Sequence, residues 1–182
     1  MKVISGIAHG RNLKSPDGLE VRPTISRIKE AIFNSIMFRI EGSVFLDIFS
    51  GSGAIGIEAL SRGAQKAFFI EKNKKCIEII KKNLELTKLT DRAEIICDDA
   101  MVAIKKMYEQ KILCDLIFMD PPYNKNLVNE TIHCLEKFNI LAEDAIIICE
   151  TSSSENIAKS DRFDFFKTKL YNKIMINYAK ER

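Results

Sequence analysis

"FLDIFSGSGAIGIEAL", residues 45 to 60, decides the fold, because it joins a strand pattern to a helix pattern through a glycine-rich loop. An apolar run comes first, and the loop then places Gly51, Gly53 and Gly56 in G-x-G-x-x-G spacing. Glycines at such a turn allow a ligand to approach the backbone, beside a helix N-terminus whose N–H groups lack partners. The stretch therefore predicts a strand, a nucleotide-type binding loop and a helix.

The same alternation of strand and helix patterns continues along the chain. Short apolar runs of the kind buried on both faces of a sheet recur at 44–49, 67–71, 93–97, 115–120 and 145–150. Amphipathic stretches at 54–62, 73–88, 100–110 and 126–139 separate them. This order predicts an α/β fold with a mostly parallel sheet, right-handed crossovers and helices on both faces.

The two ends of the chain depart from this alternation. The tail carries two strand-like stretches split near residues 171–173, which predicts a C-terminal antiparallel hairpin. At the front, a hairpin-like turn precedes a helix from about Ser26 to Ile40, with Ile28, Ile32, Phe33 and Ile36 on one face. The N-terminal piece is thus expected to be a small hairpin plus a helix.

Length and charge suggest how the chain is organised. Its 182 residues suit a single domain, with Gly42-Ser43 as the seam between an extension, 1–43, and a core, 44–182. The net charge of +3 lies wholly in the extension, because residues 44–182 contain equal numbers of basic and acidic side chains. This basic piece fits either a phosphate-contacting arm or a basic solvated face.

Export and membrane insertion are not expected. No apolar run approaches the roughly 18 residues that span a bilayer, and the first residues lack the apolar core of a secretory signal. The five cysteines contain no C-x-x-C pair, so we expect reduced thiols and no metal site; Cys97, Cys114 and Cys149 lie in apolar runs and should be buried. These features predict a cytoplasmic protein with no membrane contact.

Carboxylates near the loop suggest which nucleotide it holds. Glu71 ends the next strand, 20 residues after Gly51, where a carboxylate accepts hydrogen bonds from ribose hydroxyls. Asp47 lies four residues before Gly51 and would repel a pyrophosphate but attract the ammonium and sulfonium of S-adenosylmethionine. After the third strand, Asp98 or Asp99 could contact the adenine amine or simply cap the next helix. The charge pattern favours S-adenosylmethionine over a nicotinamide dinucleotide.

"DPPY", residues 120 to 123, follows the fourth predicted strand. In a doubly wound sheet the first and fourth strands flank the point where strand order reverses, so this motif should face the glycine loop across one crevice. The Asp120 carboxylate and the Pro121 carbonyl could accept the two N–H groups of an exocyclic amine, while Pro121 and Pro122 stiffen the turn. Tyr123 offers a flat face for an extruded base. The pattern indicates N-methylation of a nucleobase amine.

These residues resemble the class I S-adenosylmethionine-dependent methyltransferases, whose amino-nitrogen members carry a (D/N)PP(Y/F) motif. "SGIAHGRNLKSP" and "VRPTISRIKEAIFNSI" add a specific likeness to the bacterial 16S ribosomal RNA guanine-N2 methyltransferases of the D type, over nearly the whole chain. The resemblance implies a Rossmann-like, mostly parallel seven-stranded sheet. It also implies S-adenosylmethionine contacts from Asp47, Gly51, Ser52, Gly53, Glu71, Asp99 and Ala100, and a guanine amine held by Asp120, Pro121, Pro122 and Tyr123.

The resemblance further implies methylation of the exocyclic N2 amine of a guanine in 16S ribosomal RNA, free or in a small-subunit assembly particle. The residues predicted to grip RNA phosphates are Arg11, Lys14, Arg22, Arg27 and Lys29. We expect a monomer. The motif alone leaves two other functions open: adenine-N6 methylation of DNA and glutamine-N5 methylation of a protein. Nicotinamide-dependent oxidoreduction is an alternative from a different class, and it would leave the DPPY motif unexplained. A binding module without enzymatic activity is a further alternative.

Overall fold

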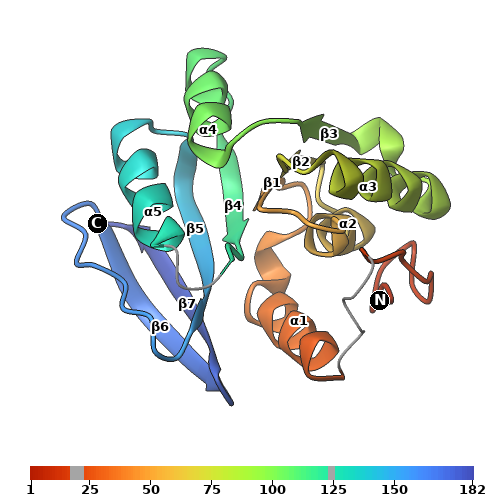
Figure 1. Cartoon of the computed structure of the whole chain (residues 1–182), viewed down its shortest axis with the longest axis horizontal. Coiled ribbons are helices and arrows are strands. Elements are labelled where there is room, and N and C mark those ends of the chain that lie inside the picture. Colours follow the sequence, from red (N-terminus) through yellow and green to blue (C-terminus); the bar gives the residue numbers. More distant parts are fainter. Residues whose placement is uncertain (17–22, 123–125) are drawn as a thin grey trace.

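The computed structural model describes residues 1–16, 23–122 and 126–182, and it contains a seven-stranded sheet with helices on both faces (Figure 1). The strands are β1 (Val44–Ile48), β2 (Lys66–Ile70), β3 (Ala93–Ile96), β4 (Cys114–Met119), β5 (Leu141–Ser152), β6 (Phe163–Tyr171) and β7 (Ile174–Glu181). Their order in the sheet is β3-β2-β1-β4-β5-β7-β6. The predicted fold class is confirmed.

The helices fall where amphipathic stretches were predicted. They are α1 (Pro23–Ser35), α2 (Ala54–Ser61), α3 (Lys74–Thr87), α4 (Ala100–Glu109) and α5 (Leu127–Lys137). The helix predicted to reach Ile40 ends at Ser35, and a short 3-10 turn, Met37–Arg39, follows. The four apolar residues predicted for its buried face are all buried, at 3% exposure or less.

Strand pairing places the reversal point between β1 and β4. Both are parallel neighbours, with Asp47 opposite Phe118 and Ile48 opposite Met119. β5 continues on the far side of β4, with Met119 opposite Cys149. The carboxyl ends of β1, β4 and β5 therefore meet at one edge of the sheet, where a doubly wound fold binds its ligand.

The core is divided into two layers by the sheet. One layer contains α1, α2 and α3 against alternate strand residues such as Phe45, Phe118 and Ile148. The other contains α4 and α5 against the intervening residues such as Leu46 and Cys149. Because strand side chains alternate between faces, any residue two positions after Phe118 or Ile148 points toward the α1–α3 layer.

The C-terminal hairpin is confirmed, with β7 pairing antiparallel to both β5 and β6. The N-terminal hairpin is more limited than predicted, because Lys2 and Asn12 form a single antiparallel bridge rather than paired strands. All five cysteines are free, but the predicted burial of Cys97 is wrong, because β3 ends at Ile96 and Cys97 lies beyond it, exposed. Within the described ranges, no helix has the length and apolar character that crossing a bilayer requires.

Candidate active site

The glycine loop turns sharply between β1 and α2, and three of its residues adopt left-handed backbone conformations. They are Phe49, Gly51 and Gly53, with φ of 63°, 55° and 75°. The Ser50 hydroxyl donates to the Asp47 carbonyl at 2.6 Å, and the Gly53 N–H donates to the Ser50 carbonyl at 2.7 Å. A positive φ is rare for a bulky residue such as Phe49, and strained residues of this kind gather at functional sites.

Asp47 lies beneath this loop, 2% exposed, on the side of β1 that faces α2. Its carboxylate accepts a hydrogen bond from the Gly56 N–H at 3.0 Å. Burial raises the pKa of Asp47 to about 8, opposed by that hydrogen bond and reinforced by the Glu71 carboxylate. A cation bound nearby would favour the ionised form, so the site is suited to a positively charged ligand.

Glu71 joins the end of β2 to the loop. Its two oxygens accept hydrogen bonds from the Gly51 N–H at 2.9 Å and the Asn73 N–H at 2.8 Å. Each carboxylate oxygen has a further lone pair, so these bonds leave capacity to accept a ribose hydroxyl. The structure thus brings Glu71 and the glycine loop into direct contact.

Asp98, Asp99 and Ala100 lie at the start of α4. Asp99 caps this helix by accepting the Met101 N–H at 3.2 Å, and it forms an ion pair with Lys72 at 3.4 Å. Asp98 pairs with Lys106 at 2.7 Å, and this hydrogen bond lowers the pKa of Asp98. Of the two readings the sequence left open, the capping role is present, and the adenine contact stays a prediction.

Asp120 follows the last residue of β4, one step beyond Met119. It lies two positions after Phe118 and therefore on the same face as Asp47. Pro121 is buried and Pro122 is exposed. Tyr123 lies outside the described residues, as does Arg22 from the basic set.

A cavity of about 210 Å³ joins the glycine loop to the end of β4. It is smaller than the 300 to 1,000 Å³ of typical ligand pockets, so a nucleoside cofactor would also extend over the loop surface. Its lining comes from the glycine loop and the start of α2, from the ends of strands, from α1 and from the N-terminal segment. The residues that line it include Ser52, Asp47, Asp120, Glu150, Ile28 and Lys29.

Three carboxylates of this lining come from adjacent strands: Asp47 from β1, Asp120 after β4 and Glu150 in β5. Asp120 is exposed to solvent as a whole residue, although protein atoms surround its carboxyl group. Burial raises the pKa of Asp120 well above its usual value, and the carboxylates of Glu150 and Asp47 raise it further. Once ionised, these carboxylates would repel a pyrophosphate and attract a cation, and in either protonation state their oxygens accept hydrogen bonds from N–H donors.

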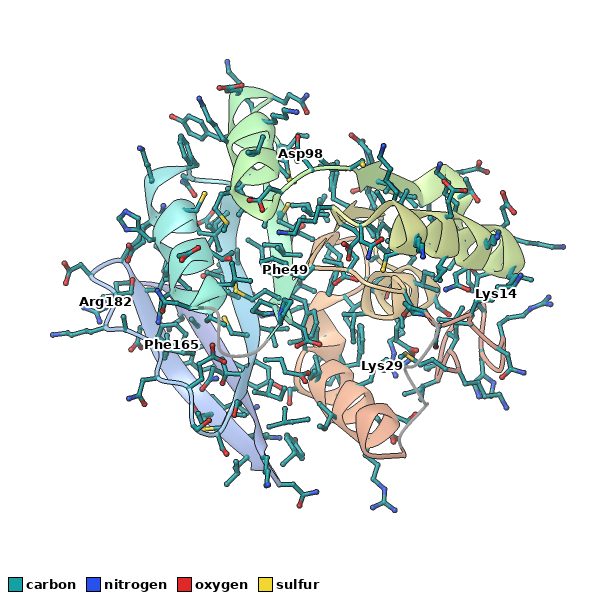
Figure 2. The ribbon with its side chains drawn as sticks, in the orientation of Figure 1. Lys14, Lys29, Phe49, Asp98, Phe165 and Arg182 are labelled. Carbon is teal, nitrogen blue, oxygen red and sulfur yellow. The ribbon has the colours of Figure 1, made fainter. Side chains whose placement is uncertain are left out.

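Lys29 does not have the role that the sequence suggested. Its side chain is 2% exposed, so the prediction that it grips RNA phosphates is wrong. It forms an ion pair with Glu58 of α2 at 2.9 Å and donates to the Lys2 carbonyl at 2.7 Å (Figure 2). Glu58 also accepts the N–H groups of Ile4 and Ser5, which fastens the N-terminal segment to the helix that follows the glycine loop.

The other described residues of the predicted RNA-contacting set lie at the surface. Arg11, Lys14 and Arg27 are exposed. Lys14 precedes Ser15, and Arg27 precedes Ile28, and both of these neighbours line the cavity. Two hydrogen bonds with the Asn83 side chain of α3 hold the Lys14 backbone. Figure 2 labels Lys14 next to this helix. Exposed positive charge therefore lies near the carboxylate-lined cavity.

The sequence patterns did not indicate that Phe49, Glu150 and the Lys29–Glu58 pair belong to this site. Glu150 could have been found, because it is the single acidic residue at the end of the fifth apolar run, at the same edge as Asp120. Phe49 carries no sequence signal for its positive φ. The burial of Lys29 depends on the packing of α1 against α2, which helical periodicity does not specify.

Comparison with known proteins is consistent with this geometry. The family model described as "Conserved hypothetical protein 95" matches residues 1–180. "Putative rRNA methyltransferase YlbH" of Bacillus subtilis is 38% identical over 150 residues, 82% of each chain. "Ribosomal RNA small subunit methyltransferase D" of Haemophilus influenzae is 35% identical over 170 residues, 93% of this chain and 88% of that protein.

Solved structures support the same grouping. The structure described as "Putative methyltransferase yhhF from Escherichia coli" superimposes with a TM-score of 0.88 at 30% identity, covering 100% of this chain and 97% of that one. More distant structures that share the fold include S-adenosylmethionine-dependent methyltransferases, one complexed with SAH. The chain belongs to the ribosomal RNA small subunit methyltransferase D family and has the fold of the S-adenosylmethionine-dependent methyltransferases.

Proposed function

We propose that this chain methylates the exocyclic N2 amine of a guanine in 16S ribosomal RNA, using S-adenosylmethionine. The observation that carries the proposal is the set of carboxylates from β1, β4 and β5 on one cavity beside the glycine loop. The family relationship to small-subunit ribosomal RNA methyltransferases supports the RNA substrate. A nicotinamide dinucleotide fits this cavity poorly, because its pyrophosphate would face Asp47 and Asp120.

The residues present fit S-adenosylmethionine. Its ammonium and sulfonium would be attracted to Asp47 and the other cavity carboxylates. Its ribose hydroxyls would donate hydrogen bonds to Glu71 at the loop. Gly51 leaves open space where a side chain would stand, since the nearest atom to an added Cβ is 4.0 Å away. When bound, the cofactor supplies an electrophilic methyl group on a sulfonium.

The chain must make a poor nucleophile reactive. The lone pair of a guanine N2 amine is delocalised into the ring. Acceptors held against its two N–H groups draw the nitrogen toward tetrahedral geometry. The Asp120 carboxylate and the Pro121 carbonyl are suited to this, because the proline ring fixes the turn and supplies no competing N–H.

The raised pKa of Asp120 fits this role. In the empty site, burial and the neighbouring carboxylates favour its neutral form. A cationic sulfonium and the N–H donors of the base both favour the ionised form. Filling the site would therefore shift Asp120 toward its ionised form, which is the acceptor that the reaction needs.

A charge-removing variant tests the catalytic assignment. Asp120→Asn keeps the shape of the side chain and should lower single-turnover methyl transfer at saturating cofactor about 100-fold or more, as for other removed transition-state contacts. Asp161→Asn, at an exposed position, is the matched control. Labelled S-adenosylmethionine with naked 16S ribosomal RNA and with small subunits provides the assay. Equal transfer by both variants would refute the role of Asp120.

We also propose that Arg11, Lys14, Arg22 and Arg27 contact RNA phosphates. Each contact adds about 0.7 to 0.9 to the log–log slope of affinity against salt, so Arg11→Ala with Lys14→Ala should flatten it by about 1.4 to 1.8. Lys111→Ala with Lys180→Ala is the control. Both lysines are exposed, and they lie toward the amino ends of β4 and β5, at the other end of these strands from the cavity. An unchanged slope in the first pair would exclude this surface.

A further inference from the structure

Glu150 occupies the position on β5 that corresponds to Asp120 on β4. Met119 pairs with Cys149, so the next residue of each strand, Asp120 and Glu150, lies at the same level. Neighbouring strands are about 4.8 Å apart. Figure 1 shows β4 and β5 side by side in the middle of the sheet. The two carboxylates are therefore adjacent at the sheet edge.

Both carboxylates point toward the same side of the sheet. Phe118 and Ile148 are paired and belong to the α1–α3 layer. Asp120 and Glu150 follow these residues by two positions and share their face. Both line the cavity, and the carboxylate of Glu150 contributes to the raised pKa of Asp120.

The order of the strands determines which groups lie next to one another in the cavity. The glycine loop follows β1, the amine-holding Asp120 follows β4, and Glu150 belongs to β5. We consider a base whose amine lies at Asp120 and whose methyl donor lies on the β1 side. The edge of the base next to that amine then faces β5. Glu150 is the cavity-lining acid on that side.

The edge of guanine offers what a carboxylate accepts. Next to the N2 amine is N1, which carries a hydrogen in guanine. In adenine, the ring nitrogen beside the exocyclic amine has a lone pair instead, which a carboxylate would repel. A polar site of this kind rejects an analogue that lacks the matching hydrogen by factors that reach about 10⁴.

We propose that Glu150 is the specificity-determining residue for the base and accepts the N1–H of the target guanine. The inference rests on the proposed function, because it presumes that guanine N2 is the methylated atom. Asp120 and the Pro121 carbonyl take the two hydrogens of the amine, and Glu150 takes the adjoining ring hydrogen. Glu150 thereby distinguishes guanine from bases that present a lone pair at this position.

An analogue of guanine tests the assignment without moving the reacting atom. 2-Aminopurine keeps the C2 amine but has a lone pair at N1. Ligated 16S ribosomal RNA would carry either guanine or 2-aminopurine at the position that the unmodified protein methylates, as naked RNA and in reconstituted small subunits. Methyl transfer to each is measured as kcat/KM with labelled S-adenosylmethionine.

The expected result is a change of preference. The unmodified protein should prefer guanine by about 10-fold or more, given 1 to 3 kcal/mol for a good base contact. In Glu150→Gln the amide can donate to N1 of 2-aminopurine. The preference should fall at least 10-fold, with a gain on 2-aminopurine in absolute terms. Glu143→Gln, an exposed position on the same strand, should leave the preference unchanged.

The outcomes separate the inference from the function on which it depends. If the unmodified protein methylates no guanine, the proposed function fails before any variant is tested. If it methylates guanine and Glu150→Gln slows both bases by the same factor, Glu150 is merely structural and the inference is overturned. A change in the charge around Asp120 affects both bases alike, so the ratio is unaffected by it. Far-UV circular dichroism and thermal unfolding confirm that the variant is folded.

Discussion

Replacing Asp47 by Asn should remove a loss of stability that the cofactor-free parent suffers as pH rises, and it should weaken the binding of a cationic cofactor. Burial raises the pKa of Asp47 from an ordinary 3.8 to about 8. A carboxyl group whose pKa is raised by folding favours the folded state while protonated, and this contribution is lost as pH rises toward the folded pKa. Asn has no proton to lose, so the variant escapes this loss.

The magnitude follows from linkage. Each unit of pKa difference corresponds to about 1.4 kcal/mol, so the unfolding free energy of the parent should fall relative to the variant by up to about 1.4 kcal/mol per pH unit. Between pH 5 and pH 8 the upper bound is about 4 kcal/mol. Below pH 4, Asp47 is protonated in both states, and well above pH 8 it is ionised in both, so the difference levels off.

Urea unfolding of both proteins at pH 5, 6, 7, 8 and 9, without cofactor, measures this difference. A buried amide adds a cost that does not depend on pH, so the slope is the readout, and groups common to both proteins cancel. Cofactor affinity at pH 8.5 should fall about 10-fold or more in Asp47→Asn and remain unchanged in Asp161→Asn, an exposed position outside the cavity. Parallel stability curves from pH 5 to pH 8 would refute the reasoning.

Two further substitutions test how the N-terminal segment is fastened to α2. Lys29→Met removes one of the two ion-pair partners of the buried Glu58 and leaves Arg62, so it should cost about 1.5 to 3 kcal/mol of unfolding free energy, whereas Lys81→Met at an exposed pair should cost less than about 1 kcal/mol. Urea titrations give both values, and equal losses would contradict the buried pair. Gly6→Ala places a Cβ 1.8 Å from a backbone oxygen of α2, while Gly10→Ala has similar φ and open space, so Gly6→Ala should lower Tm much more. Similar Tm values would show that the segment is not closely packed there.

The fold was predictable because its signals are local and repeated. Five apolar runs alternate with amphipathic stretches, and burial on both faces leaves little choice but a parallel sheet. The relation between Asp47 and Asp120 followed from the same logic, since the first and fourth strands of such a sheet flank its reversal. The family resemblance added the number of strands.

The remaining features depend on tertiary packing. A lysine at the border of the apolar face of a helix can be exposed or buried, and Lys29 is buried because Glu58 stands opposite it. Cys97 continues an apolar run in the sequence, yet the strand ends one residue earlier. The role proposed for Glu150 depends on the strand register, which places it beside Asp120. Such pairings join residues far apart in the sequence.

The central claim is that the loop and the carboxylates of this cavity transfer a methyl group to guanine N2 in 16S ribosomal RNA. Its most direct test is nucleoside mass spectrometry of this RNA after incubation with the protein and S-adenosylmethionine bearing a deuterated methyl group, with RNA from a strain that lacks the chain. The account predicts that the label appears in N2-methylguanosine. Label in N6-methyladenosine, in protein glutamine or in neither would contradict it.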